Sequence, residues 1–272
     1  MRSPQNAPVL ITGAGRGIGK RLALGFAQAG SPVGLLGRSQ AELDVTKLEI
    51  EHGGGTALRL RADVTDFDQV SAAVEKMTHT LGEVYALIAN AGVQGPIGPF
   101  VENRPRDWRE VFEVNVLGVM NCCRAVAPQM IQRRSGKIVV VSGSGAEEPR
   151  PAFCAYSASK AAVVRFAESL AEEVREHNVQ VNSMFPGGAY TSMTDEILHA
   201  GYRAGINETE AAEHIRLTGG VPPDKQTQLA LFLASERSNH VTGKLLHAQD
   251  DWKKLERENG RPDSFTLRRH LK

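Results

Sequence analysis

The amino-acid sequence predicts an α/β protein with a single domain, built on a doubly wound parallel β-sheet with helices on both faces. Two observations lead to this prediction. Short, almost wholly apolar runs alternate with longer amphipathic segments along most of the chain, and no repeat or low-complexity linker divides its 272 residues. Such alternation indicates βαβ units, whose right-handed crossovers cover both faces of a parallel sheet. The length is sufficient for one large core.

The expected strands are short and apolar, as strands buried on both faces should be. They lie at 9–11, 33–36, 57–61, 85–89, 137–141, 179–184 and, at the end of the domain, 241–247. The amphipathic segments predict helices at 17–29, 40–51, 67–81, within 105–132, at 155–177 and at 222–234. Gly30 ends the first helix and the glycines at 53–55 end the second, because glycine adopts the backbone conformation that closes a helix.

Two segments depart from this alternation. Residues 191–220 are polar, mixed and interrupted by glycines, and we expect either a lid on the substrate side of a site or a plain surface excursion. Residues 250–272 form a highly charged tail, for which we expect partial disorder or docking on a partner. The predicted domain therefore spans residues 1–249.

The composition excludes several classes of protein. The formal net charge is +1, which gives no reason to expect nucleic acid or an anionic membrane as partner. No apolar run reaches the roughly 18 residues that span a bilayer, and residues 1–8 are too polar for a signal peptide, so we expect a cytoplasmic protein. Cys122, Cys123 and Cys154 lack a disulfide framework, and we interpret them as small buried apolar side chains, with a catalytic thiol as the alternative. The eight histidines lack ligand spacing, so we expect no metal site.

The turn after the first strand has the chemistry of a phosphate cradle. Glycines allow the backbone to turn tightly and approach a pyrophosphate, while the following helix offers free N–H groups and a positive dipole end. A strand before the turn and a helix after it are the context that a dinucleotide site of the Rossmann type requires. The residues expected to bind the cofactor here are Thr12, Gly13, Gly15, Arg16, Gly17, Ile18 and Gly19.

The spacing of these glycines, Thr-Gly-x-x-x-Gly-x-Gly, departs from the common dinucleotide fingerprint and resembles that of the classical short-chain dehydrogenase/reductase family. The resemblance extends to about Gly243 through further motifs that follow strand ends, where open α/β sheets bind ligands. It implies that Asp63-Val64 contacts adenine, that Asn90-Ala91-Gly92 lies beside the adenosine ribose, and that a Pro-Gly-x-x-x-Thr segment lies near the nicotinamide. The residues matching this last segment are Pro186, Gly187, Ala189 and Thr191.

The expected cofactor is NADP rather than NAD. Enzymes that prefer NAD usually place an acidic residue at the end of the second strand, where it binds the ribose 2′-hydroxyl. This chain has Gly37-Arg38 there. Arg38 and Arg16 offer two guanidinium groups, which suit a 2′-phosphate by charge and by geometry. The alternative is that both arginines are solvated surface charges.

Tyr156 and Lys160 form a Tyr-x-x-x-Lys pair whose spacing puts both side chains on one face of a helix. Hydride transfer at a carbon–oxygen centre needs a matching proton on the oxygen. A tyrosine hydroxyl is a poor base near neutral pH, and a nearby ammonium lowers its pKa. The resemblance implies that Lys160 also holds the nicotinamide ribose, with Tyr156 beside the cofactor, and that Asn115 positions Lys160 through a water.

Two departures from the family pattern stand out. The family's catalytic serine lies thirteen residues before the tyrosine, and this position is Gly143. Of its two neighbours we expect Ser142, at the strand end, to polarise the substrate, with Ser144 second. The chain also replaces the family's Asp-Gly-Gly segment by the residues at 245–252, and a charged tail with Arg268-Arg269-His270 follows.

These features predict an oxidoreductase that transfers a hydride between NADP(H) and a secondary alcohol or ketone, with Tyr156, Lys160, Ser142 and Asn115 as catalytic residues. One alternative is a cofactor-binding regulatory or structural protein with little turnover, supported by Gly143 and the altered C-terminus. A second, an epimerase or dehydratase acting on nucleotide sugars, fits the length and glycine spacing poorly. The family resemblance implies a homodimer or homotetramer that packs the helices at 105–132 and 155–177 against a neighbour.

Overall fold

Seven parallel strands form one sheet in this computed structural model, which describes residues 7–256 and 264–267. Their order is β3-β2-β1-β4-β5-β6-β7, and every neighbouring pair is parallel. The chain leaves β1 toward β2 on one side and reaches β4 on the other, which creates a crevice at the carboxyl ends of β1 and β4. The predicted fold class is confirmed. The strands are β1 (Val9–Thr12), β2 (Val33–Gly37), β3 (Ala57–Arg61), β4 (Ala86–Ala89), β5 (Gly136–Val141), β6 (Val179–Phe185) and β7 (Leu245–His247).

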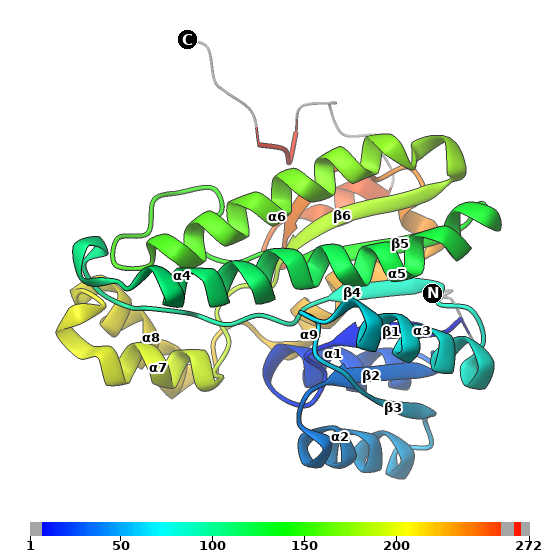
Figure 1. The fold of residues 1–272 in the computed structure, drawn as a ribbon, viewed down its shortest axis with the longest axis horizontal. Coiled ribbons are helices and arrows are strands. Elements are labelled where there is room, and N and C mark those ends of the chain that lie inside the picture. Colours follow the sequence, from blue (N-terminus) through cyan, green and yellow to red (C-terminus); the bar gives the residue numbers. More distant parts are fainter. Residues whose placement is uncertain (1–6, 257–263, 268–272) are drawn as a thin grey trace.

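Helices cover both faces of the sheet (Figure 1). Residues of one strand alternate between the two layers: Val9 and Ile11 pack with the helices of one face, and Leu10 packs with those of the other. Each face therefore carries its own apolar cluster, as the sequence pattern requires. The first layer holds α1 (Gly17–Gln28), α2 (Gln40–His52) and α9 (Pro223–Leu233), and the second holds α3 (Phe67–Leu81), α5 (Gly118–Gln132) and α6 (Cys154–Glu173).

The helical segment predicted at 105–132 is interrupted. It consists of α4 (Pro105–Phe112), a wider π-helical turn at Glu113–Leu117, and α5. Within the wide turn, the Asn115 side chain bonds to another segment: its Oδ1 accepts from the Val93 N–H at 2.8 Å and its Nδ2 donates to the Val93 carbonyl at 3.0 Å. Such turns are frequent at functional sites.

Two other boundaries differ from the expectation by more than one residue. The last strand is β7, Leu245–His247, rather than 241–247, because the preceding turn places Gly243 at φ 68°, outside strand conformation. The long helix at 155–177 ends at Glu173 and continues as a short 3-10 turn at Arg175–His177. Neither difference changes the place of the candidate site residues, which follow the ends of other strands.

Residues 191–220 contain two helices, α7 (Ser192–Ala200) and α8 (Ile206–Thr218). An antiparallel bridge between Ala189 and Gly220 closes the base of this segment. Figure 1 shows α7 and α8 (yellow) next to α4 at one end of the molecule, away from the two helical layers. This position is compatible with the predicted lid, which stays a prediction.

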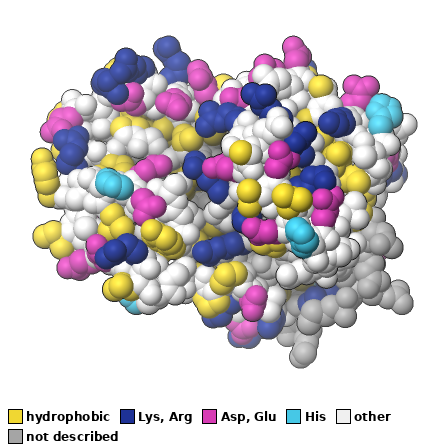
Figure 2. Space-filling view, turned by 90° about the horizontal axis from the view of Figure 1, so that it is seen from below, with side chains coloured by type: hydrophobic (Ala, Val, Ile, Leu, Met, Phe, Trp, Pro, Cys, Tyr) yellow, Lys and Arg dark blue, Asp and Glu magenta, His cyan; other side chains and the backbone are white. Residues whose placement is uncertain are grey.

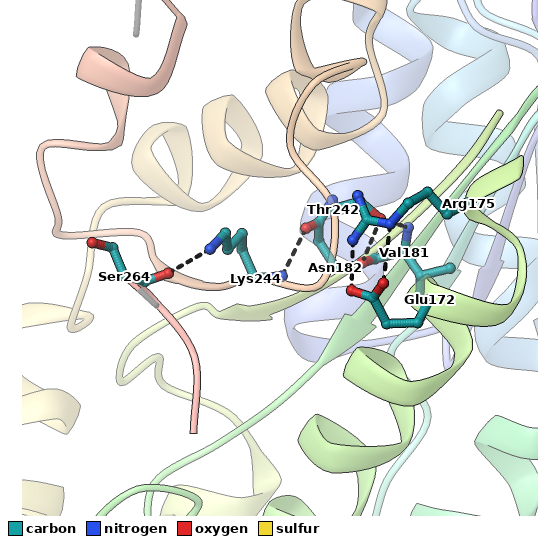
Figure 3. Close-up of polar contacts among 7 residues, drawn as sticks. All are labelled: Glu172, Arg175, Val181, Asn182, Thr242, Lys244 and Ser264. Carbon is teal, nitrogen blue, oxygen red and sulfur yellow. Dashed lines mark hydrogen bonds and ion pairs between the residues drawn. The ribbon is translucent and has the colours of Figure 1, made fainter. Parts of the chain in front are cut away.

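The described part of the charged tail packs on its own chain. Trp252 stacks on Phe232 of α9 with ring centroids 5.0 Å apart. Figure 3 shows Lys244 between Asn182 and Ser264: the Lys244 N–H donates to Asn182 Oδ1 at 3.0 Å and its Nζ donates to the Ser264 carbonyl at 2.8 Å. The remaining tail residues, 257–263 and 268–272, lie outside the described residues, and Arg268-Arg269-His270 are among them.

Acidic and basic side chains are mixed across the face seen in Figure 2, and apolar side chains lie there singly or in small groups. Within residues 7–256 and 264–267, no helix has the length and apolar character needed to cross a bilayer.

Candidate active site

A cleft of about 520 Å³ opens at the carboxyl ends of the strands. Its volume falls in the range of small-molecule sites. Of the residues that the sequence singled out, most line it: Gly13, Gly15, Arg16, Gly17, Ile18, Arg38, Asp63, Val64, Asn90, Ala91, Gly92, Ser142, Gly143, Ser144, Tyr156, Lys160, Pro186, Gly187, Ala189 and Thr191. Segments distant in sequence thus meet at one end of the sheet, because parallel strands all end there.

The glycine-rich turn adopts the tight geometry that its sequence suggests. Gly13 and Gly17 have φ values of 65° and 55°, a left-handed region that favours glycine. A Cβ on Gly19 would overlap the Gly13 carbonyl, so this glycine is needed for the close approach of helix and turn. Thr12 and Gly19 do not line the cleft. Thr12 instead ties the turn to β4, since its Oγ1 accepts from the N–H groups of Asn90 at 3.0 Å and Ala91 at 2.9 Å.

Two arginines stand at the rim of the cleft. Arg16 Nη1 lies 3.7 Å from Glu42 Oε1, and Arg38 Nη1 lies 3.8 Å from Asp63 Oδ2. Both arginine side chains are 66% exposed, so these long ion pairs leave each guanidinium with unused donors. Glu42 escaped the sequence reasoning, although its place in the first turn of α2, three residues after the capping Ser39, points it toward the glycine-rich turn.

Tyr156 and Lys160 lie in α6, and their side chains meet the cleft from within the core. They are only 8% and 4% exposed. Lys160 Nζ donates to the Val141 carbonyl at 2.9 Å and lies 5.6 Å from the centre of the Tyr156 ring. Burial lowers the pKa of Lys160 to about 8. Burial raises the pKa of the Tyr156 hydroxyl, and the nearby Arg150 guanidinium opposes this effect.

Asn115 is fully buried and does not line the cleft. Its Nδ2 donates to Ser159 Oγ of α6 at 3.0 Å as well as to Val93. A Cβ on Gly92 would lie 3.2 Å from Asn115 Oδ1, which is a tight contact, and 3.6 Å from Lys160 Nζ, so the Gly92 backbone lies close to both groups. Asn115 therefore supports the turn after β4 and the helix that carries the lysine.

The serine positions differ in their surroundings. Ser142 is 3% exposed, and its buried Oγ has no hydrogen-bond partner among the described residues. Ser144 is exposed. A Cβ on Gly143 would overlap the Tyr156 Oη and would lie 3.1 Å from the Tyr156 Cζ. The tyrosine hydroxyl thus fills the space of the side chain that this position lacks.

Besides Glu42, the sequence reasoning missed further polar residues of the cleft, among them Gln94, Arg150 and Glu196. Gln94 is 3% exposed, and its buried Nε2 has no partner within the described residues. Arg150 donates from Nε and Nη2 to the carboxylate of Glu208 at 2.8 and 2.7 Å. Glu196 of α7 also lines the cleft, and burial raises its pKa while Arg16 opposes the shift. No local pattern marks these residues, because only the fold brings them together.

None of the three cysteines lines this cleft. In the part of the chain that the structure describes, no group of three His, Cys, Asp or Glu side chains is arranged to hold a metal ion. The three cysteines are free, and burial raises the pKa of Cys122 to about 12, which keeps it a thiol.

Comparisons with known proteins place this chain in a family. The family model described as short chain dehydrogenase matches residues 7–200. A 3-oxoacyl-(acyl-carrier-protein) reductase of Thermotoga maritima is 36% identical over 237 residues, which cover 87% of this chain and 94% of that protein. A gluconate 5-dehydrogenase of Gluconobacter oxydans is 34% identical over 250 residues, covering 90% and 93%.

Among solved structures, a gluconate 5-dehydrogenase from Burkholderia cenocepacia in complex with NADP and tartrate superposes with a TM-score of 0.79. It is 29% identical and covers 89% of this chain and 93% of its own. Fold, site and relatives together show that the chain belongs to the short-chain dehydrogenase family and is an NAD(P)-dependent oxidoreductase.

Proposed function

We propose that this protein transfers a hydride between NADP(H) and a secondary alcohol or ketone. The observation that carries the proposal is the position of Tyr156 and Lys160, which are almost fully buried and yet line the cleft together. A buried hydroxyl next to a buried amine is an arrangement for moving a proton to or from a substrate oxygen.

When bound, the nicotinamide supplies the hydride, and the protein supplies orientation and the proton. In the reducing direction the Tyr156 Oη donates its proton to the carbonyl oxygen as that oxygen gains negative charge, and in the oxidising direction the phenolate takes the proton back. Lys160, when its amine is protonated, stabilises that phenolate. The unpartnered Ser142 Oγ and Gln94 Nε2 are buried donors beside the cleft, and we assign them to the substrate oxygens. Asn115 holds the backbone around Lys160.

The residues present fit a dinucleotide phosphate. The left-handed glycines at 13 and 17 open a backbone cradle with the α1 N-terminus behind it. Arg16 and Arg38 at the rim keep unused donors for a 2′-phosphate, and no acidic residue occupies the position of Arg38. The NADP bound by the Burkholderia cenocepacia relative supports the same choice here. Asp63 and Val64 are assigned to the adenine, and Pro186, Gly187, Ala189 and Thr191 to the nicotinamide.

Fluorescence titration with NADPH and with NADH tests the cofactor assignment. We expect NADPH to bind more tightly, and Arg38→Ala and Arg16→Ala to remove that preference while leaving NADH binding unchanged. Arg175→Ala is the matched control, because this arginine pairs with Glu172 at the far end of α6. Equal binding of both nucleotides by the wild type would refute the phosphate role of the two arginines.

A cofactor-binding protein with little turnover is a second candidate, favoured by the missing hydroxyl at Gly143. This candidate has the same nucleotide site as the proposed oxidoreductase, but it does not catalyse hydride transfer at a useful rate. Consumption of NADPH in the presence of a panel of ketones supports the enzyme. Tight NADPH binding without consumption across such a panel supports the second candidate.

We propose further that α7 and α8 form the substrate-side lid, since Met193, Ile197 and Ile215 of these helices line the cleft. Exposed apolar side chains at the end of the wide turn and at the start of α5 support a homodimer or homotetramer: Leu117 is 50% and Met120 is 40% exposed. Light scattering tests the assembly, and a strict monomer would refute it. The free cysteines suit a reducing compartment, and we assign the protein to the cytoplasm.

A further inference from the structure

We propose that Arg150 is a positioning residue. Its ion pair with Glu208 docks α8 onto the active site and keeps the Arg150 guanidinium beside Tyr156. The inference rests on the hydride-transfer function proposed above and adds a residue pair that the family motifs did not point to. It concerns two positions 58 residues apart in the sequence, one in the β5–α6 loop and one in the first turn of α8.

The pair is bidentate. Arg150 Nε donates to Glu208 Oε1 at 2.8 Å, and Nη2 donates to Oε2 at 2.7 Å. The two side chains are 10% and 27% exposed, which removes much of the screening that weakens surface ion pairs. Parallel hydrogen bonds between a guanidinium and a carboxylate fix orientation as well as distance. The contact therefore sets where α8 lies relative to the loop.

The same guanidinium is fixed over the start of α6. It lies 3.8 Å from the ring centre of Phe153, which is fully buried, and 5.7 Å from the ring centre of Tyr156. Phe153 and Tyr156 belong to one apolar cluster with Ile197 of α7 and Ala212 of α8. Movement of the two lid helices would therefore disturb the wall against which Tyr156 packs.

Charged groups of the described residues approach the tyrosine and its neighbours from several elements. Lys160 lies on its own helix with its ammonium turned to the Val141 carbonyl, Glu196 enters the cleft from α7, and Glu208 faces Arg150 from α8. Arg150 is a second cation near the hydroxyl and opposes the effect of burial, because a guanidinium favours the phenolate and lowers the pKa of Tyr156. If the Arg150 guanidinium moves away from this position, the pKa of Tyr156 rises.

The pH dependence of kcat/KM distinguishes positioning from simple electrostatics. Arg150→Gln removes the cation, so the limb of the profile that reports Tyr156 should move to higher pH. Glu208→Gln removes an anion, whose direct effect on Tyr156 would move that limb to lower pH. If Glu208 acts by holding Arg150 in place, its removal moves the limb to higher pH instead, and KM for the ketone rises by about tenfold.

Glu213→Gln is the matched control, because it removes a carboxylate from the same helix whose partner is Arg216, away from the loop. Its pH profile should match the wild type. A shift to lower pH in Glu208→Gln, or wild-type profiles in Arg150→Gln, would overturn the proposal.

Hydrogen–deuterium exchange of residues 206–218 gives a readout that needs no turnover. Exchange should rise in Arg150→Gln and Glu208→Gln and stay unchanged in Glu213→Gln. Unchanged exchange in the first two variants would refute the docking role. If the wild type consumes no cofactor at all, the proposed function is refuted. The exchange experiment still tests whether the Arg150–Glu208 ion pair docks α8.

Discussion

Introducing the family's serine at Gly143 should slow this enzyme rather than improve it. Any side chain at this position places a Cβ within overlap of the Tyr156 Oη and 3.1 Å from its Cζ. Real Cβ contacts below 3.0 Å essentially do not occur, so the ring must move. Tyr156 is 8% exposed and packed in a cluster with Phe153 and Ile197, which leaves little room for such movement.

The magnitude follows from the sensitivity of catalysis to position. A displacement of about 1 Å at a reacting group can lower the rate by about 100-fold, which corresponds to about 2.7 kcal/mol. We expect Gly143→Ala to lower kcat/KM by about this factor. Gly143→Ser adds a hydroxyl, and a well-placed donor contributes a similar stabilisation. Because the donor arrives together with the displacement, kcat/KM of this variant should lie between those of the Ala variant and the wild type.

The assay is NADPH consumption with the ketone that the screen identifies, and NADPH titration verifies that both variants keep their cofactor site. Comparison of the two variants separates the steric effect of the Cβ from the effect of the hydroxyl. A Gly143→Ala variant with wild-type kcat/KM, or a Gly143→Ser variant faster than the wild type, would refute the reasoning.

Three further predictions concern other parts of the molecule. Glu42→Gln should tighten NADPH binding by about threefold and leave NADH binding unchanged in fluorescence titrations, since it removes an anion near Arg16. Asn115→Leu should lower the free energy of unfolding by about 2 kcal/mol in urea titrations, because it leaves the Val93 N–H and carbonyl without partners; an unchanged midpoint would contradict this. Burial lowers the pKa of Lys137 from 10.5 to about 7, so the unfolded chain binds more protons between these values and stability rises with pH there. Lys137→Met should flatten that rise in denaturation curves measured across this pH window.

Much of the fold was readable from the sequence because its signals are local. Apolar runs buried on both faces mark the strands, and the glycines at 13 and 17 mark a turn that needs left-handed backbone. The pair Tyr156 and Lys160 is four residues apart on one helix, so a short pattern suffices to place both side chains together.

The remaining features depend on contacts between distant segments. The wide turn at 113–117 contains Asn115, whose side chain bonds to Val93, and no helical periodicity reveals this contact. Arg150 and Glu208 lie in a loop and a lid helix, and only the fold joins them. Packing of the charged tail through Trp252 likewise depends on an aromatic partner in another helix, whereas composition suggested disorder or an external partner.

The central claim is that Tyr156 handles the proton in a hydride transfer at a substrate carbon–oxygen bond. It is tested most directly by following NADPH oxidation and alcohol formation with wild type and Tyr156→Phe at saturating NADPH. We expect equal amounts of alcohol formed and NADPH consumed by the wild type, and a Tyr156→Phe variant that binds NADPH normally but turns over at least about 100-fold more slowly. Wild-type turnover in the phenylalanine variant would contradict the account.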